Sequence, residues 1–224
     1  TQSYSITIAG GNAAESGSGS SWQGTYTMPN SYSEGAVTFS IDFNDLSGNA
    51  ASTVTTTTNG SAVQFDKTAP SLSQITAVTA QTGGTTPDYT FSSNDAGTIT
   101  YGGSCSSSTT AASSGNNTIT FNALSGGTYS NCTITVTDSA NNASDPLSVS
   151  SFIVDKTGPS LSEVTAVPTP TSDNTSSYTF SSNEAGTITY GGSCSSTDNT
   201  SVASNNTITF NELAEGTYSN CTIT

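Results

Sequence analysis

The chain of 224 residues carries two Lys, no Arg and no His against sixteen Asp plus Glu, which gives a formal net charge of −14. Nucleic-acid binding and attraction to anionic lipid both need cationic side chains, so the composition excludes both kinds of partner. No stretch approaches the about 20 apolar residues of a membrane span, and direct membrane insertion is not expected. Only 31% of residues are hydrophobic but just 8% are charged, which favours folded, half-buried strands over disorder.

The first segment, residues 1–65, is predicted to be a small β-domain that is N-terminally incomplete. Residues 35–45 alternate apolar with polar side chains, a period of two that indicates a strand with one buried face. The chain's only Trp, Trp22, stands in a second alternating run that is typical of a core strand. The face predicted to be buried carries Val37, Phe39, Ile41 and Phe43.

The second segment, residues 66–154, is predicted to be a complete all-β domain. Strand-like runs rich in Thr, Ile, Val, Tyr and Phe are separated by Gly, Asn, Ser or Pro, and no window has a helical period. Six or seven short strands with frequent turns favour a β-sandwich. The predicted strands cover residues 72–80, 88–93, 97–103, 118–124, 129–138 and 148–154.

The third segment, residues 155–224, repeats the second at an interval of 89 residues. Residues 67–135 and 156–224 are identical at 46 of 69 positions without any insertion or deletion. A period of 89 residues is too long for a solenoid unit and close to one small β-domain. The segment is predicted to be a C-terminally incomplete copy, so that the chain is a linear array of tandem domains.

The four cysteines form two equally spaced pairs. Cys105 and Cys132 lie 27 positions apart, as do Cys194 and Cys221. We therefore predict one disulfide per repeat, in preference to a zinc site or a nucleophilic thiol. Two thiols without His are too few for structural zinc, and nothing cationic lowers a thiol pKa. Aligning the first segment on the second places Phe39 opposite Cys132, which predicts that this cysteine points into the core.

The Leu-x-x-Gly-x-Tyr pattern that ends at Tyr129 and Tyr218 resembles the tyrosine corner of Ig-like sandwiches, in which the Tyr hydroxyl bonds back to the backbone. The join Asp-Lys-Thr-x-Pro occurs at residues 66–70 and 155–159, and an Asp-x-Ala-Asn-Asn turn stands at 138–142. These joins, the turn and the stretch from Thr38 to Asn49 together resemble the bacterial Ig-like repeats of giant secreted surface adhesins. The resemblance covers the whole chain and implies tandem Ig-like β-sandwich domains.

The same resemblance implies Ca²⁺ at the domain joins. Ca²⁺ takes six to eight oxygen ligands, which two domain ends can pool. The alternative interpretation is turn chemistry, because Asp and Asn favour tight turns without any metal. The candidate ligands are Asp66, Asp155, Asp138, Asn141, Asp145, Asp42 and Asp45.

The expected function is structural: a stalk segment of a large extracellular bacterial repeat adhesin that projects a binding head from the cell surface. Its expected partners are neighbouring repeats of the same chain. The alternative is a subunit of an extracellular filament, in which strands from identical chains complete the first and third segments. A carbohydrate-binding module ranks last, because that role expects exposed aromatic residues. We expect no enzyme, since the chain lacks His and its carboxylates fall in no catalytic motif.

Overall fold

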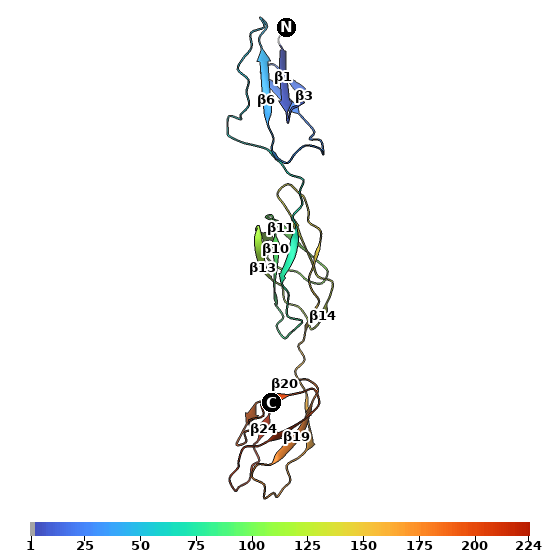
Figure 1. The fold of residues 1–224 in the computed structure, drawn as a ribbon, viewed down its shortest axis with the longest axis vertical. Helices are drawn as coiled ribbons and strands as arrows, with labels where there is room; N and C mark the ends of the chain where they lie inside the picture. The colour runs from blue at the N-terminus through green and yellow to red at the C-terminus, as the bar shows by residue number, and fades with distance from the viewer. Residues whose placement is uncertain (1–2) are drawn as a thin grey trace. The chain divides into compact units, whose positions relative to one another are not determined.

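The computed structural model describes residues 3–224, which form β-strands and no helix (Figure 1), so the all-β prediction is confirmed. No helix long and apolar enough to cross a membrane occurs among them. The chain divides into two compact units, Thr1–Asp155 and Lys156–Thr224. Every strand pairing nevertheless lies inside one of the three segments defined by the sequence, and the division into three domains stays a prediction.

The first segment contains three small antiparallel sheets. Strand β1 (Ser3–Ile8) pairs along its whole length with β6 (Phe39–Asn44), which begins at Phe39, and β2 extends this sheet on the other edge of β1. Strands β3 and β4 form a hairpin, and β5 pairs with β7. The remaining strands of this segment are β2 (Gly11–Asn12), β3 (Ala14–Ser18), β4 (Ser21–Thr25), β5 (Gly35–Ala36) and β7 (Gln64–Phe65).

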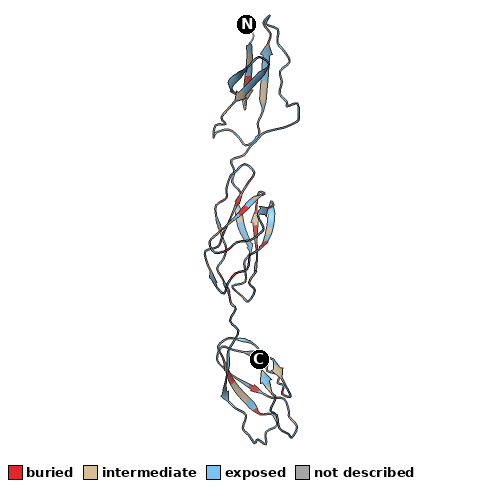
Figure 2. Ribbon diagram, turned by 180° about the vertical axis from the view of Figure 1, so that it is seen from behind, coloured by how far each residue is buried: buried red, intermediate tan, exposed pale blue. Residues whose placement is uncertain are grey.

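The core predicted for the first segment is wrong in part. Ile6 is the only buried apolar residue described there, and Figure 2 shows few buried residues in this segment. On β6, Ile41 and Phe43 are exposed by 37% and 40%, while Phe39 is half-buried. Trp22 is 43% exposed because it lies on the two-stranded β3–β4 hairpin, where its ring packs against Tyr4 at 4.2 Å and no second layer covers it.

The second segment builds three sheets. Their orders are β13-β10-β8, β12-β11-β15-β16 and β14-β17-β9, and only the β17–β9 pair is parallel. The strands are β8 (Leu72–Thr76), β9 (Gln81–Thr82), β10 (Asp88–Ser93), β11 (Gly97–Gly102), β12 (Ala111–Ala112), β13 (Gly115–Thr120), β14 (Gly127–Tyr129), β15 (Thr133–Thr137), β16 (Leu147–Ser148) and β17 (Phe152–Val154).

The predicted strands of this segment are found with shifted bounds. The predicted strand 88–93 matches β10, whereas 118–124 moves back to β13 at Gly115–Thr120. The predicted strand 129–138 is interrupted: its first residue is the last of β14, the next residues include Cys132 of the disulfide, and β15 follows. The predicted strand 148–154 divides into the last residue of β16 and the whole of β17.

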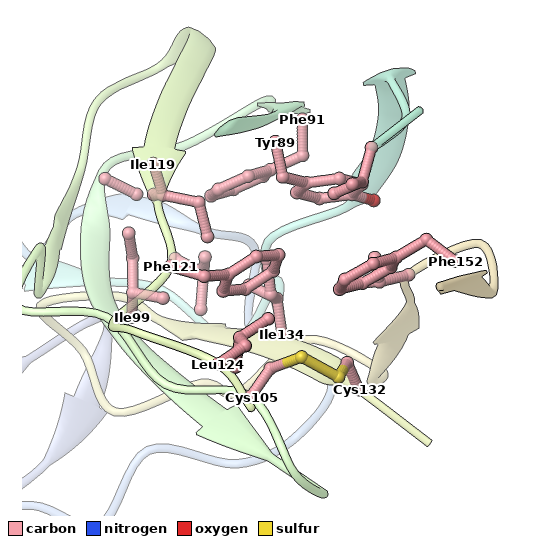
Figure 3. Packing of buried hydrophobic residues seen from close by; sticks show 14 of the residues in the cluster. Tyr89, Phe91, Ile99, Cys105, Ile119, Phe121, Leu124, Cys132, Ile134 and Phe152 are labelled. Atoms are coloured by element: carbon pink, nitrogen blue, oxygen red, sulfur yellow. A yellow bond between two sulfur atoms is a disulfide. The ribbon is translucent and has the colours of Figure 1, made fainter. Parts of the chain in front are cut away.

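The core of the second segment draws side chains from all three sheets (Figure 3). Tyr89 and Phe91 of β10, Ile134 of β15 and Phe152 of β17 are each exposed by 1% or less. Because apolar residues at every second position point to one face, the strands bury one side each and leave Thr and Ser on the other. The largest fully buried side chains of this segment therefore belong to a single cluster.

Both predicted disulfides are present. Cys105 pairs with Cys132 and Cys194 with Cys221, with Cα–Cα separations of 5.3 and 5.2 Å. Cys132 is 2% exposed, so it points into the core as predicted, and Figure 3 shows its disulfide beside Leu124.

The tyrosine-corner hydrogen bond implied by the resemblance is also present. The Tyr129 hydroxyl donates to the carbonyl oxygen of Ser125 at 3.0 Å. In the third segment the Tyr218 hydroxyl donates to the carbonyl oxygen of Ala214 at the same distance.

The third segment repeats the pairing of the second. Its sheet β18-β19-β23 has the registers Leu161↔Ser182 and Ser177↔Thr209, which are those of β8-β10-β13 moved by 89 residues. The remaining strands form two-stranded sheets, β20–β22 and β21–β24. The strands are β18 (Leu161–Thr165), β19 (Ser177–Ser182), β20 (Gly186–Thr187), β21 (Tyr190–Gly191), β22 (Thr200–Ser201), β23 (Asn205–Thr209) and β24 (Thr222–Ile223).

Candidate metal centre

Three carboxylates of the second segment converge, although they come from separate places in the sequence. Asp66 lies between β7 and β8, Asp95 lies in the turn between β10 and β11, and Asp138 follows β15. One oxygen of each lies within 4.8 Å of the others. Asp138 is buried, with 6% of its surface exposed, and the other two are half-buried.

Asp138 is held by the turn that it begins. Its Oδ1 accepts the backbone N–H groups of Ala140 and Asn142 at 2.8 and 2.9 Å, and its Oδ2 accepts the Asn142 side-chain amide at 2.9 Å. Asn141 has a φ of 70°, a left-handed conformation that Asn tolerates. Burial alone would raise the pKa of Asp138, but the hydrogen bonds from Asn142, Ala140 and Asn141 together hold that pKa below its usual value.

The first segment builds the same turn on Asp45. Its Oδ1 accepts the backbone N–H groups of Ser47 and Asn49, both at 2.8 Å, and its Oδ2 accepts the Asn49 amide at 2.9 Å. The Asn49 side chain is the main cause that lowers the pKa of Asp45. No other acidic group joins Asp45 in a cluster among residues 3–224. Here the turn chemistry offered as the alternative interpretation accounts for the Asp–Asn pattern without a metal.

Asp66 and Asp95 each use one carboxylate oxygen in a local hydrogen bond. Oδ1 of Asp66 accepts the Thr68 N–H at 2.9 Å, and Oδ1 of Asp95 accepts the Ala96 N–H at 2.7 Å. The second oxygen of each accepts no hydrogen bond from any described residue. Asn142 ties the centre together, since its amide also donates to the Asp66 carbonyl at 3.3 Å.

Among residues 3–224, no basic side chain neutralises this centre. The neighbouring Lys67 turns its ammonium to the carbonyl oxygens of Asn30 and Tyr32, at 2.9 and 3.1 Å. The three carboxylates therefore repel one another, and a bound cation would relieve that repulsion.

The donor set fits a hard divalent cation. Ca²⁺ prefers carboxylate and carbonyl oxygens, and a carboxylate oxygen that accepts one hydrogen bond keeps a further lone pair. Three carboxylates are fewer than the six to eight oxygens that Ca²⁺ takes, so water would supply the rest.

The remaining candidate ligands lie elsewhere. Asp155 accepts a hydrogen bond from the Gln81 side chain at 2.8 Å, and Asp42 accepts one from the Thr53 hydroxyl at 2.5 Å. Asn141 and Asp145 are exposed, and Asp145 is not one of the three clustered acidic residues. The structure thus brings Asp66 and Asp138 together among the candidate ligands, and calcium binding there stays a prediction.

Asp95 is absent from the ligands predicted from the sequence, because a single Asp in a turn has no characteristic spacing to other acidic residues. One signal was available: the third segment carries Glu184 at the matching position, so the site is acidic in both repeats. In comparisons with protein-family models, curated proteins and solved structures, nothing matches this chain.

Proposed function

We propose that the chain is a structural stalk segment of a large extracellular bacterial surface protein. In this proposal each repeat is an Ig-like β-sandwich, and the array positions a binding head away from the cell. The family assignment rests on the join, turn and tyrosine motifs of the sequence. The disulfides support an oxidising compartment, since such bonds are rare in the cytosol.

One observation carries the proposal: two copies of one sequence unit share the pairing of one three-stranded sheet and the position of one disulfide. The registers of β8-β10-β13 and β18-β19-β23 agree residue for residue, and the disulfides match. Duplicating a domain without changing its fold adds length and adds no new chemistry. The longest strands of the second segment have six residues, which span about 20 Å. With the turns at both ends of the strands, each repeat would add at least this length.

The test is small-angle X-ray scattering of chains that carry two, four and six copies of residues 66–154. A stalk predicts a maximum dimension that rises by a constant amount of at least about 20 Å for each copy added. A dimension that grows only as the cube root of chain length would show that the copies fold back on one another, and the stalk would be rejected.

As part of this proposal, the second segment binds Ca²⁺ between Asp66, Asp95 and Asp138. The ion fixes the join that contains Asp66 to the two turns that carry Asp95 and Asp138. Sites with few protein ligands in extracellular modules bind in the range of about 10⁻⁴–10⁻³ M. Calcium titrated into the chain after removal of metal with a chelator should give a measurable heat of binding. The dissociation constant should fall in that range, and calcium should raise the melting temperature of the chain.

The matched variants are Asp95→Asn, inside the cluster, and Asp145→Asn, exposed and outside it. Asp95→Asn should weaken calcium binding at least about tenfold, because it removes one of three ligands, while Asp145→Asn should bind as the wild type does. Equal heats of calcium binding for the two variants, or no heat for the wild type, would contradict a calcium site at the three aspartates.

A further inference from the structure

The chain has only two basic side chains, and each stands in a join between segments. Lys67 lies in the join Asp-Lys-Thr-Ala-Pro and Lys156 in the join Asp-Lys-Thr-Gly-Pro. An endoprotease that recognises a basic residue therefore has two candidate sites in 224 residues. Both lysines are exposed, and the two joins differ at one position, so a difference in cleavage must come from the contacts around each lysine.

The first segment holds the side chain of Lys67 by its ammonium group. The Nζ atom donates to the carbonyl oxygens of Asn30 and Tyr32, at 2.9 and 3.1 Å. It also lies 5.9 Å from the centroid of the Phe65 ring, against which the Tyr32 ring packs edge-on at 6.0 Å. A protease that binds lysine in a specificity pocket has to withdraw the ammonium group from these partners before it can cut.

The chain around Lys67 is held by one carboxylate, that of Glu34. Its Oε1 accepts the Lys67 backbone N–H at 3.0 Å and the Thr68 hydroxyl at 2.7 Å. The residue before Lys67 is held from the second segment, because the Asn142 amide donates to the carbonyl oxygen of Asp66 at 3.3 Å. Burial and hydrogen bonding of the backbone decide where a folded chain is cut, so these contacts should make the first join resistant to a protease.

The second segment has no acid at the position of Glu34. The strand pair β5–β7 leads into the first join and β14–β17 into the second, and in each pair a glycine lies opposite the last residue before the join. These glycines, Gly35 and Gly127, both have a positive φ, of 127° and 150°. The residue before each is Glu34 in the first segment and Gly126 in the second. Gly126 has no side chain and therefore offers no carboxylate to the second join.

We propose that the Glu34 contacts shield Lys67 and leave Lys156 as the site at which a lysine-specific serine endoprotease cuts the native chain. The reaction is hydrolysis: the C–N bond between Lys156 and Thr157 breaks, the hydroxyl of a water molecule adds to the Lys156 carbonyl carbon, and its proton goes to the Thr157 nitrogen. The products are residues 1–156 and 157–224, so the first two segments stay joined. This inference depends neither on the stalk function nor on calcium binding.

The test is timed digestion of the full chain with lysyl endopeptidase, followed by mass spectrometry, in a chelator that keeps metal away from Asp66. Fragments 1–156 and 157–224 should form at least about tenfold faster than fragments cut after Lys67, because cleavage of a native chain follows the local opening of the cleaved segment. Peptides with the sequences of residues 63–72 and 152–161 should be cut at equal rates. Equal cleavage at the two joins of the chain, or a matching difference between the peptides, would overturn the proposal.

Glu34→Ala should speed cleavage after Lys67 at least about tenfold, since it removes the acceptor of both the Lys67 N–H and the Thr68 hydroxyl. The matched control is Asp145→Ala, which removes an exposed carboxylate outside the joins and should leave both cleavage rates unchanged. A rate after Lys67 that is the same in Glu34→Ala as in the wild type would overturn the proposal.

The reverse exchange, Gly126→Glu, does not depend on the folding of the Glu34 variant. The third segment carries Glu215 at this position of the repeat, so the repeat accepts the side chain. Cleavage after Lys156 should become at least about threefold slower, because the new carboxylate supplies the acceptor that the first join has. An unchanged rate after Lys156 would show that this acid does not cause the difference between the joins, and the proposal would be rejected.

Discussion

Gly103 and Gly192 occupy equivalent positions, with φ angles of 73° and 74°. A Cβ atom on Gly103 would lie 1.9 Å from the carbonyl oxygen of Asn131, and one on Gly192 would lie 1.9 Å from that of Asn220. Both a left-handed backbone and a backbone clash therefore require glycine here. Gly103→Ala is expected to lower the free energy of unfolding by about 2 kcal/mol or more, measured by urea denaturation.

Gly158→Ala is the matched control for that substitution. No atom lies within 4 Å of a Cβ built at Gly158, and the second segment has Ala69 at the same position. The control should unfold within about 0.5 kcal/mol of the wild type. If the two variants were equally stable, the close approach at Gly103 would not constrain the fold.

Two acidic residues of the first segment make its stability depend on pH. Hydrogen bonds, chiefly from Asn49 to Asp45 and from Thr68 to Glu34, hold the pKa of each carboxyl below its ordinary value of 3.8 or 4.5. A lowered folded-state pKa stabilises the fold above the ordinary pKa, and this stabilisation is lost as the pH falls through the lowered value. The first segment should therefore weaken below a pH of about 4.

Trp22 fluorescence measures this effect selectively, because the only Trp of the chain lies in the first segment. Asp45→Asn should lower stability at neutral pH and flatten the acid profile, since the neutral amide no longer titrates. An acid profile unchanged by Asp45→Asn would show that this carboxylate contributes nothing to the pH dependence.

At the scale of elements, each disulfide ties a cysteine three positions after β11 or β21 to the cysteine directly before β15 or β24. Closing a loop between cysteines 27 positions apart restricts the unfolded chain, by about 3.5 kcal/mol on the chain-entropy model. Reduction, or the pair Cys105→Ala with Cys132→Ala, should lower the urea midpoint of the second segment accordingly.

The first segment serves as an internal control for reduction because it contains no cysteine. Its Trp22 transition should not move when reductant is added. A reduced chain that unfolds as the oxidised chain does would mean that the core of the second segment suffices without the crosslink.

At the scale of the whole molecule, the two compact units should unfold separately. The hydrophobic core of the second segment contains fifteen buried residues, among them Val149, Phe152 and Val154, whereas that of the third segment contains five. The third segment therefore buries less apolar surface than the second and should melt at a lower temperature. Scanning calorimetry should resolve at least two transitions, and Gly192→Ala should move only the transition of the third segment. A single cooperative transition would contradict this prediction.

The amino-acid sequence was sufficient for the features that are local or periodic. Alternation at β10 predicted a strand with one buried face, because side chains of a strand point to opposite sides. The 89-residue interval predicted that the second and third segments share one fold, and equal cysteine spacing predicted both disulfides. The Asp-x-x-x-Asn turns at Asp45 and Asp138 follow from hydrogen bonds within five residues, so their sequence pattern carries their structure.

Only the tertiary structure decided the features that depend on distant partners. Asp95 joins Asp66 and Asp138 because the segment before β8 meets the turns that follow β10 and β15, and no spacing in the sequence encodes that meeting. Trp22 stands in an alternating run typical of a core strand, yet it is exposed. Periodicity predicts only which residues lie on the same face of a strand, whereas burial also needs a second layer that covers this face. Gly-Thr-Tyr pairs as β14 in one repeat and stays unpaired in the other, because a strand is completed by its neighbour and its own residues do not suffice.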